Sequence, residues 1–129
     1  MSNKQLKVFR VCEDAKLPTN CSAGYELYTS HSGCVNARSR ALISTGVVVD
    51  IPIGYCGQLW SRPVLSIRNG VDVGASVVDT DYPGELKVVL YNHSDVRFTF
   101  KKHTRIAQLL IIPIITPRVV ECNSNMKTF

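Results

Sequence analysis

The sequence has no hydrophobic run long enough to cross a membrane. Its longest apolar stretch, residues 109–115, is interrupted by Pro113 and is far shorter than the roughly 20 residues that a spanning helix needs. The first residues of the chain also lack the apolar core of a secretory signal peptide. We therefore expect an intracellular protein, cytoplasmic or nuclear and not secreted, without a membrane partner.

Paired cysteine motifs are also absent. The five cysteines are an odd number and include no C-x-x-C pair, and no histidine stands at ligand spacing from them. Disulfide scaffolds and zinc sites both need closer, paired spacings. We expect five reduced thiols, at Cys12, Cys21, Cys34, Cys56 and Cys122.

Charged residues are few, 19% of the chain, and basic ones prevail, for a net charge of +5. The only basic cluster is residues 101–105, and no series of aromatic residues accompanies it. Proteins that bind nucleic acid usually combine a basic surface with stacking aromatics or a recognised motif. A nucleic-acid partner is therefore not expected, whereas a small ligand that carries phosphate suits the charge.

The residues that are present favour β-strands throughout. A length of 129 residues, 45% of them hydrophobic, suits one domain with one core over residues 1–129. Aliphatic or alternating runs of strand length occupy residues 47–51, 86–91, 96–101 and 109–112. Only residues 61–68 suit a short helical turn, with Pro63 near its start. We predict an all-β domain, a jelly roll or closed β-sandwich.

Three places interrupt the strand pattern, and each has two interpretations. Residues 79–84 (DTDYPG) form an ordinary turn, or they present a carboxylate beside a tyrosine that can activate water and pack on a ring. Gln108 lies in an apolar strand, where it meets backbone groups or faces a polar cavity. Arg62 is a solvated residue beside a turn, or a phosphate clamp.

Four segments in this order resemble the motifs of the dUTPase (deoxyuridine triphosphate nucleotidohydrolase) family. Residues 23–28 (AGYELY) resemble the first motif, A-G-[YF]-D-L, and residues 52–62 resemble the second, P-x-G-x-x-G-x-x-x-x-R. Residues 72–84 (DVGASVVDTDYPG) resemble the third, and residues 105–109 (RIAQL) match the fourth. The resemblance covers most of the chain.

The resemblance implies a jelly-roll subunit that assembles as a homotrimer, with active sites at subunit interfaces. It implies hydrolysis of dUTP to dUMP and pyrophosphate with Mg²⁺, which is held mainly through the nucleotide phosphates. Asp79 is expected to activate the attacking water, and Tyr82 to pack on the deoxyribose. The backbone at Gly74, Ala75 and Val78 is expected to bind the uracil edge. Arg62 and Gln108 are expected to contact the phosphates or the waters around Mg²⁺. Glu26 and Gln108 are expected to have a catalytic role and a water-mediated contact with the metal.

The departures from the family pattern predict reduced activity. Glu26 replaces the aspartate of the first motif, and Pro63 and Val64 replace the serine and glycine that follow the arginine of the second. Pro63 has neither a hydroxyl group nor a backbone N–H. The glycine-rich fifth motif has no counterpart, since no glycine follows Gly84.

An alternative function therefore stays open, in which the chain keeps the dUTPase fold and acts as a non-catalytic protein-interaction or regulatory module. Its anchors for a protein partner would be exposed aromatic residues. Tyr55, Trp60 and Tyr91 are the candidates, although the core is the expected place for such rings.

Overall fold

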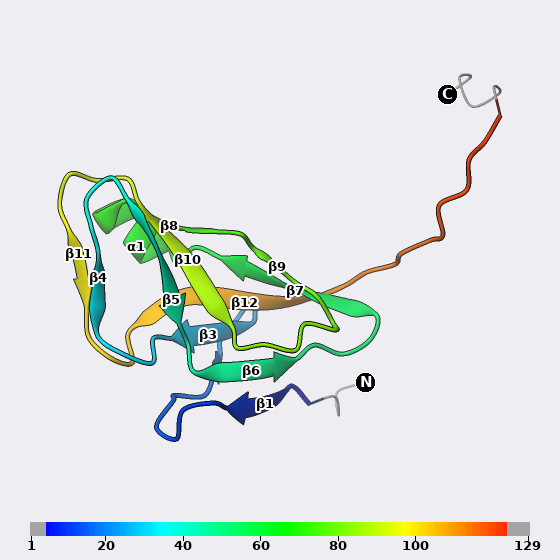
Figure 1. Ribbon diagram of the computed structural model, residues 1–129, viewed down its shortest axis with the longest axis horizontal. Coiled ribbons are helices and arrows are strands. Elements are labelled where there is room, and N and C mark those ends of the chain that lie inside the picture. Colours follow the sequence, from blue (N-terminus) through cyan, green and yellow to red (C-terminus); the bar gives the residue numbers. More distant parts are fainter. Residues whose placement is uncertain (1–4, 124–129) are drawn as a thin grey trace.

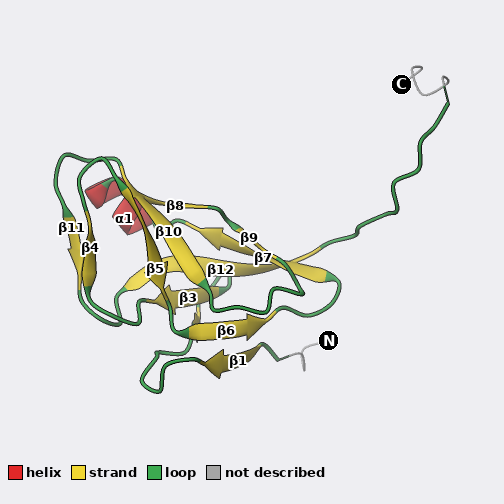
Figure 2. Ribbon diagram, viewed as in Figure 1, coloured by secondary structure: helices red, strands yellow, loops and turns green. Residues whose placement is uncertain are grey.

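The computed structural model describes residues 5–123, over which the chain forms twelve strands and one short helix (Figures 1 and 2). In chain order the first strands are β1 (Lys7–Arg10), β2 (Thr19–Asn20), β3 (Tyr25–Tyr28), β4 (Gly33–Val35), β5 (Arg40–Ser44), β6 (Val47–Asp50) and β7 (Tyr55–Trp60). They are followed by α1 (Pro63–Asn69), β8 (Val71–Gly74), β9 (Val77–Val78), β10 (Lys87–Asn92), β11 (Phe98–Phe100) and β12 (Arg105–Pro113). The prediction of an all-β jelly-roll class is confirmed.

The strands are arranged in two larger and two smaller antiparallel sheets. A five-stranded sheet has the order β2-β3-β12-β7-β9, and a three-stranded sheet has the order β5-β10-β8. β1 pairs with β6, and β4 pairs with β11. Neighbours in the sheets are mostly distant in sequence, as Figure 1 shows for β3, β7 and β12.

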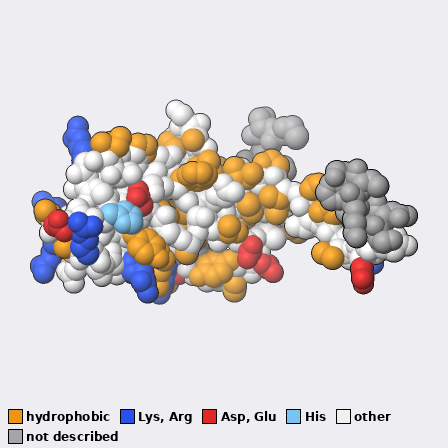
Figure 3. All heavy atoms as spheres, turned by 90° about the horizontal axis from the view of Figure 1, so that it is seen from above, with side chains coloured by type: hydrophobic (Ala, Val, Ile, Leu, Met, Phe, Trp, Pro, Cys, Tyr) orange, Lys and Arg blue, Asp and Glu red, His pale blue; other side chains and the backbone are white. Residues whose placement is uncertain are grey.

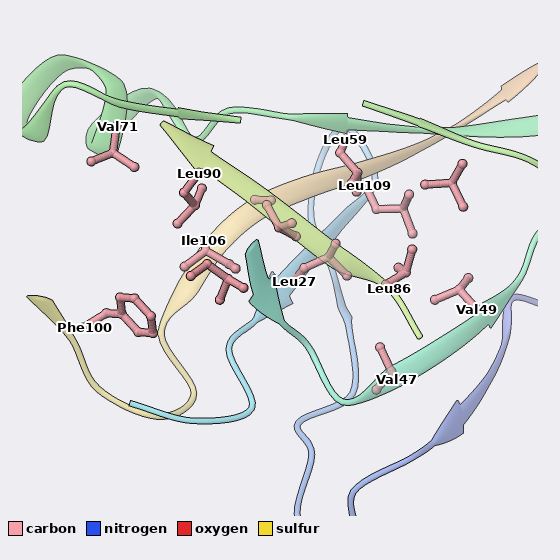
Figure 4. Close-up of a cluster of buried hydrophobic side chains, with 14 of the residues drawn as sticks. Leu27, Val47, Val49, Leu59, Val71, Leu86, Leu90, Phe100, Ile106 and Leu109 are labelled. Carbon is pink, nitrogen blue, oxygen red and sulfur yellow. The ribbon is translucent and has the colours of Figure 1, made fainter. Parts of the chain in front are cut away.

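One apolar core lies between the sheets (Figure 4). Alternate residues of each strand enter it, as the period of two along a strand requires. In β10, for example, Val88 and Leu90 are fully buried while Lys87 and Tyr91 face outward. β12 has a bulge near its start, between Arg105 and Ala107, and such an extra residue shifts the alternation of a strand. From residue 107 onward, odd positions of β12 therefore face the core.

The short helix α1 begins with Pro63, where the missing N–H costs no hydrogen bond. It ends at Gly70, whose φ of 66° is the left-handed conformation that glycine adopts most easily. The expected helical turn near residues 61–68 is confirmed, and its start is set directly after Arg62. No helix within residues 5–123 is long and apolar enough to span a membrane.

Candidate functional site

Residues from the first, second and fourth motif segments meet on the outer face of the five-stranded sheet. In the strand register, Gln108 of β12 lies directly opposite Glu26 of β3 on one side and Trp60 of β7 on the other. Directly opposed residues project to the same face of a sheet. Arg62 follows Trp60 by two residues, and its side chain reaches Glu26. We call Glu26, Arg62, Gln108 and Trp60 the outer-face cluster.

An ion pair ties this cluster together. The Nε of Arg62 donates a hydrogen bond to Oε1 of Glu26 over 3.3 Å, and the two side chains are only 21% and 15% exposed. Arg62 is thus not a freely solvated arginine, and the longer side chain of Glu26 is long enough to reach it. Gln108 faces outward and is half-buried between Glu26 and Trp60. The cluster combines a guanidinium group, a carboxamide and a carboxylate, which suits a polyphosphate and its cation.

Gly24 allows β3 to lie close enough to β12 for this arrangement. A Cβ atom at Gly24 would collide with the carbonyl oxygen of Leu109 and lie 3.2 Å from its carbonyl carbon. Backbone atoms of a paired strand cannot move aside without separating the strands. Only glycine therefore permits the register that puts Glu26 opposite Gln108.

The third motif segment forms a different site, a cavity of about 200 Å³ beside Asp79. Asp79 and Tyr82 are exposed at its edge, whereas its inner lining includes buried residues of the core. The lining consists of Leu59, Ala75, Val77, Val78, Asp79, Tyr82, Leu86 and Lys87. A cavity that combines apolar side chains with polar groups, and has a carboxylate at its rim, suits a ring with a reactive group attached to it.

Hydrogen bonds fix the turn that carries Asp79 and Tyr82. The backbone N–H of Tyr82 donates to the carbonyl of Asp79 over 3.1 Å. The Thr80 hydroxyl donates to the carbonyl of Ile51 over 2.6 Å, and the Tyr82 hydroxyl donates to the carbonyl of Glu85 over 3.0 Å. Residues 79–84 therefore form an ordinary reverse turn, and the same turn holds a carboxylate next to an aromatic ring. The two interpretations of this segment are compatible.

The backbone before Asp79 is held in an unusual conformation. Ala75 has a φ of +42°, which residues other than glycine rarely adopt. The carbonyl of Ser76 accepts a hydrogen bond of 2.7 Å from the N–H of Leu59. Gly74 lies under the ring of Tyr91, which a Cβ atom would strike. Such strain often occurs where backbone groups are presented to a ligand.

The outer-face cluster and the Asp79 cavity do not meet within one chain. Leu59 and Val78, which line the cavity, are buried on the core side of the sheet, while Trp60 and Gln108 project to the opposite side. None of Glu26, Arg62 and Gln108 lines the cavity beside Asp79. The structure thus groups the candidate residues into two sets instead of one site.

Basic side chains gather at the end of the molecule formed by β4, β11 and α1 (Figure 3). Arg38 there donates a hydrogen bond of 2.8 Å to Asp95. This hydrogen bond and the attraction between the charges lower the pKa of the Asp95 carboxyl and raise the pKa of Arg38.

Over residues 5–123, no three histidine, cysteine or acidic side chains are grouped so that they could hold a metal ion.

Two aromatic residues lie outside the core, contrary to expectation. Trp60 is 54% exposed and Tyr91 is 38% exposed, so the prediction that these rings belong to the core is wrong for both. Each stands at an outward position of its strand, opposite a polar residue in the neighbouring strand. The sequence did contain a sign that Trp60 faces outward. Trp60 precedes Arg62 by two residues, and residues at that spacing in extended chain project to the same face.

Comparison with known proteins shows the same fold and family. A family model described as dUTPase matches residues 12–128. The chain is 43% identical over 118 residues to the deoxyuridine 5'-triphosphate nucleotidohydrolase of Arabidopsis thaliana, covering 89% of this chain and 71% of that protein. Among solved structures, the Staphylococcus bacteriophage 80alpha dUTPase with dUPNHPP is similar, with a TM-score of 0.88, 25% identity and coverage of 95% of this chain and 90% of that one.

A second solved structure is similar in fold alone, at 23% identity. It is a mutant dUTPase from phage phi11 of S. aureus with a structural Mg(II) ion, and it matches with a TM-score of 0.88 over 95% of this chain and 99% of that one. The family model covers most of the chain, and it agrees with the identity to the plant enzyme and with the motif residues described above. This chain belongs to the dUTPase family.

Proposed function

We propose that this chain hydrolyses dUTP to dUMP and pyrophosphate. The observation that carries the proposal is the cavity of about 200 Å³ that has Asp79 and Tyr82 at its edge, in a chain of the dUTPase family. Its relatives include an enzyme named for this substrate, at 43% identity, and a dUTPase structure with dUPNHPP.

The cavity is suited to the nucleoside. Its apolar lining by Leu59, Val78 and Leu86 would receive the uracil ring, and the peptide groups of residues 74–78 would pair with the polar edge of the base. The ring of Tyr82 would pack on the deoxyribose. Because the hydroxyl of Tyr82 is bonded to the carbonyl of Glu85 over 3.0 Å, the ring is fixed in one position. A fixed ring against the sugar leaves no room for a 2′-hydroxyl.

Asp79 would act as the general base. Its carboxylate takes a proton from a water molecule as the water oxygen forms a bond to phosphorus. The bond between the α- and β-phosphates breaks, and pyrophosphate leaves with the electron pair of that bond. Positioning matters most in such reactions, and the hydrogen-bonded turn around Asp79 provides it.

The outer-face cluster would hold the phosphate chain. The guanidinium group of Arg62 has N–H groups beyond the Nε that Glu26 occupies, and these can pair with phosphate oxygens. Oxygen atoms of Glu26 and Gln108 suit Mg²⁺, which prefers oxygen ligands and usually keeps several waters. The residues fit an ion held mainly by the nucleotide phosphates. When bound, Mg²⁺ would neutralise charge on the triphosphate.

A homotrimer would unite the two sets of residues. The outer-face cluster and the Asp79 cavity lie on opposite sides of the sheet in one chain, so the cavity of one subunit would be completed by the cluster of its neighbour. In a closed ring, each interface then forms one complete site.

The proposal also includes one domain over residues 1–129, and the single core formed by residues between Ala15 and Leu109 supports it. The five free cysteines suit a reducing, intracellular compartment.

Pyrophosphate release from dUTP with Mg²⁺ tests the proposal. We expect release by the unchanged chain and its loss in Asp79→Asn, which keeps the shape of the side chain but not its basicity. The matched control is Asp81→Asn, because Asp81 is two residues away and does not line the cavity. If the unchanged chain neither hydrolyses nor binds dUTP at millimolar concentration, the enzymatic proposal is wrong and the non-catalytic interaction module takes its place.

A further inference from the structure

Trp60 is the largest residue of the outer-face cluster, and its indole is exposed. The proposed chemistry gives this side chain no role. We propose that Trp60 is a substrate-binding residue, whose indole N–H donates a hydrogen bond to the phosphate chain of the nucleotide. This inference rests on the function proposed above. It adds a donor to the phosphate site and makes triphosphate binding depend on the only tryptophan of the chain.

The strand register puts Trp60 within reach of any phosphate that the cluster binds. Trp60 lies directly opposite Gln108, and Cβ atoms of such pairs are about 5 Å apart. On its other side Gln108 lies opposite Glu26, which holds Arg62 at 3.3 Å. A polyphosphate that contacts both Arg62 and Gln108 therefore lies beside the indole.

The indole N–H is available at little cost. It now donates to Oε1 of Gln58 over 3.2 Å, in an exposed pair of neutral groups. A hydrogen bond to an ionised phosphate is about twice as strong as one between neutral groups. The indole N–H of tryptophan can only donate a hydrogen bond. Replacing the Gln58 acceptor by an anionic phosphate oxygen is therefore favourable. Pro63, directly after Arg62, offers no N–H of its own.

Space for a ligand exists beside the ring. A cavity of about 300 Å³ at the edge of the sheet is bounded by Trp60, Gln58, Ser61, Ser76, Leu59 and Val73, and it adjoins the outer-face cluster through Trp60 alone. With 54% of its surface exposed, Trp60 contributes little to the core of the subunit. A large aromatic residue with an N–H group at the edge of an open polar cavity is suited to binding and less so to packing.

Binding of dUPNHPP and of deoxyuridine to the full chain and to Trp60→Phe tests the inference. Phenylalanine keeps an aromatic side chain, although a smaller one, and removes the N–H donor; the deoxyuridine arm reports the effect of the lost ring volume. We expect Trp60→Phe to weaken dUPNHPP binding about tenfold, the equivalent of one hydrogen bond to a charged group, and to leave deoxyuridine binding unchanged. The fluorescence of Trp60 in the unchanged chain should respond to dUPNHPP and not to deoxyuridine.

For a second variant, Gln58→Leu, we expect no weakening of binding. Gln58→Leu removes the acceptor that now competes for the indole N–H, so dUPNHPP binding should be unchanged or up to about threefold tighter, given the modest net value of a neutral hydrogen bond. Ile67→Ala, on the exposed side of α1 at 83% exposure, is the control and should bind both ligands like the unchanged chain.

Three results would overturn the inference. Unchanged dUPNHPP binding by Trp60→Phe would show that the N–H is not a phosphate donor. Equal weakening for dUPNHPP and deoxyuridine would assign the ring to the base or to subunit assembly. If Gln58→Leu weakened dUPNHPP binding as Trp60→Phe does, the hydrogen bond between Trp60 and Gln58 would be needed for the local structure, and the indole N–H would not be assigned to the phosphate. If the unchanged chain binds neither ligand and releases no pyrophosphate from dUTP, the proposed function fails and this inference fails with it.

Discussion

Replacing Gly24 with alanine tests how the outer-face cluster is assembled. The added Cβ would collide with the carbonyl oxygen of Leu109 and lie 3.3 Å from the Cα of Leu110. All of these atoms belong to the backbone of β12, which is held on both sides by β3 and β7. The collision can therefore be relieved only if β3 moves away from β12, and Glu26 moves with it.

The expected cost follows from this geometry. Forcing extra volume into a packed structure costs about 1–3 kcal/mol. For a chain of this size, that lowers Tm by about 4–12 °C. Displacement of Glu26 should lower dUTP turnover further, because a shift of about 1 Å in a positioning residue can cost about 100-fold in rate. Thermal unfolding by circular dichroism at one protein concentration, and pyrophosphate release well below Tm, measure the two effects.

Gly70→Ala is the matched control for Gly24→Ala. At Gly70 the added Cβ meets nothing closer than 3.6 Å, and only the φ of +66° opposes it. The cost should be about 1–2 kcal/mol of backbone strain, with no change in turnover beyond that from stability. If Gly24→Ala matched the unchanged chain in both Tm and turnover, the reasoning about the close approach of β3 and β12 would be refuted.

Three further predictions concern the fold around the sites. Ala75→Val should be about 1–2 kcal/mol less stable than Ala75→Gly in thermal unfolding, because a β-branched residue would have to adopt the φ of +42°. Asn92→Ala should cost about 2–4 kcal/mol in urea unfolding, because the Asn92 amide donates to two backbone carbonyls over 3.1 and 2.9 Å in the interior. Arg38 lowers the pKa of Asp95, so the ion pair stabilises the fold above the usual titration range of a carboxyl and stops doing so as the pH falls through the lowered pKa. The difference in Tm between the unchanged chain and Asp95→Asn should therefore shrink on acidification.

The strands that could be predicted are those in which the residue types of the segment itself favour an extended conformation. Residues 47–51 and 86–91 are runs of β-branched and aliphatic residues, and they match β6 and β10 to within one residue at each end. Very short strands such as β2 and β9, with two residues each, have too few residues for a recognisable period. They exist because β3 and β7 offer them free edges.

The candidate residues could be found in the sequence, but their grouping could not. Glu26, Arg62 and Gln108 lie far apart along the chain and meet because β3, β12 and β7 are neighbours in one sheet. That order depends on long-range pairing, which no local pattern encodes. The position of Trp60 in the same cluster was missed because an aromatic residue in a strand is more often part of the core.

Subunit complementation tests the central claim, that dUTP is hydrolysed at sites shared between two copies of the chain. Asp79→Asn damages the cavity, and Arg62→Gln damages the outer-face cluster, so each variant alone should be inactive. When the two are unfolded and refolded together in equal amounts, about one site in four should combine an intact cavity with an intact cluster from its neighbour. We predict pyrophosphate release at about a quarter of the rate of the unchanged chain. A mixture no more active than the separate variants would contradict the account.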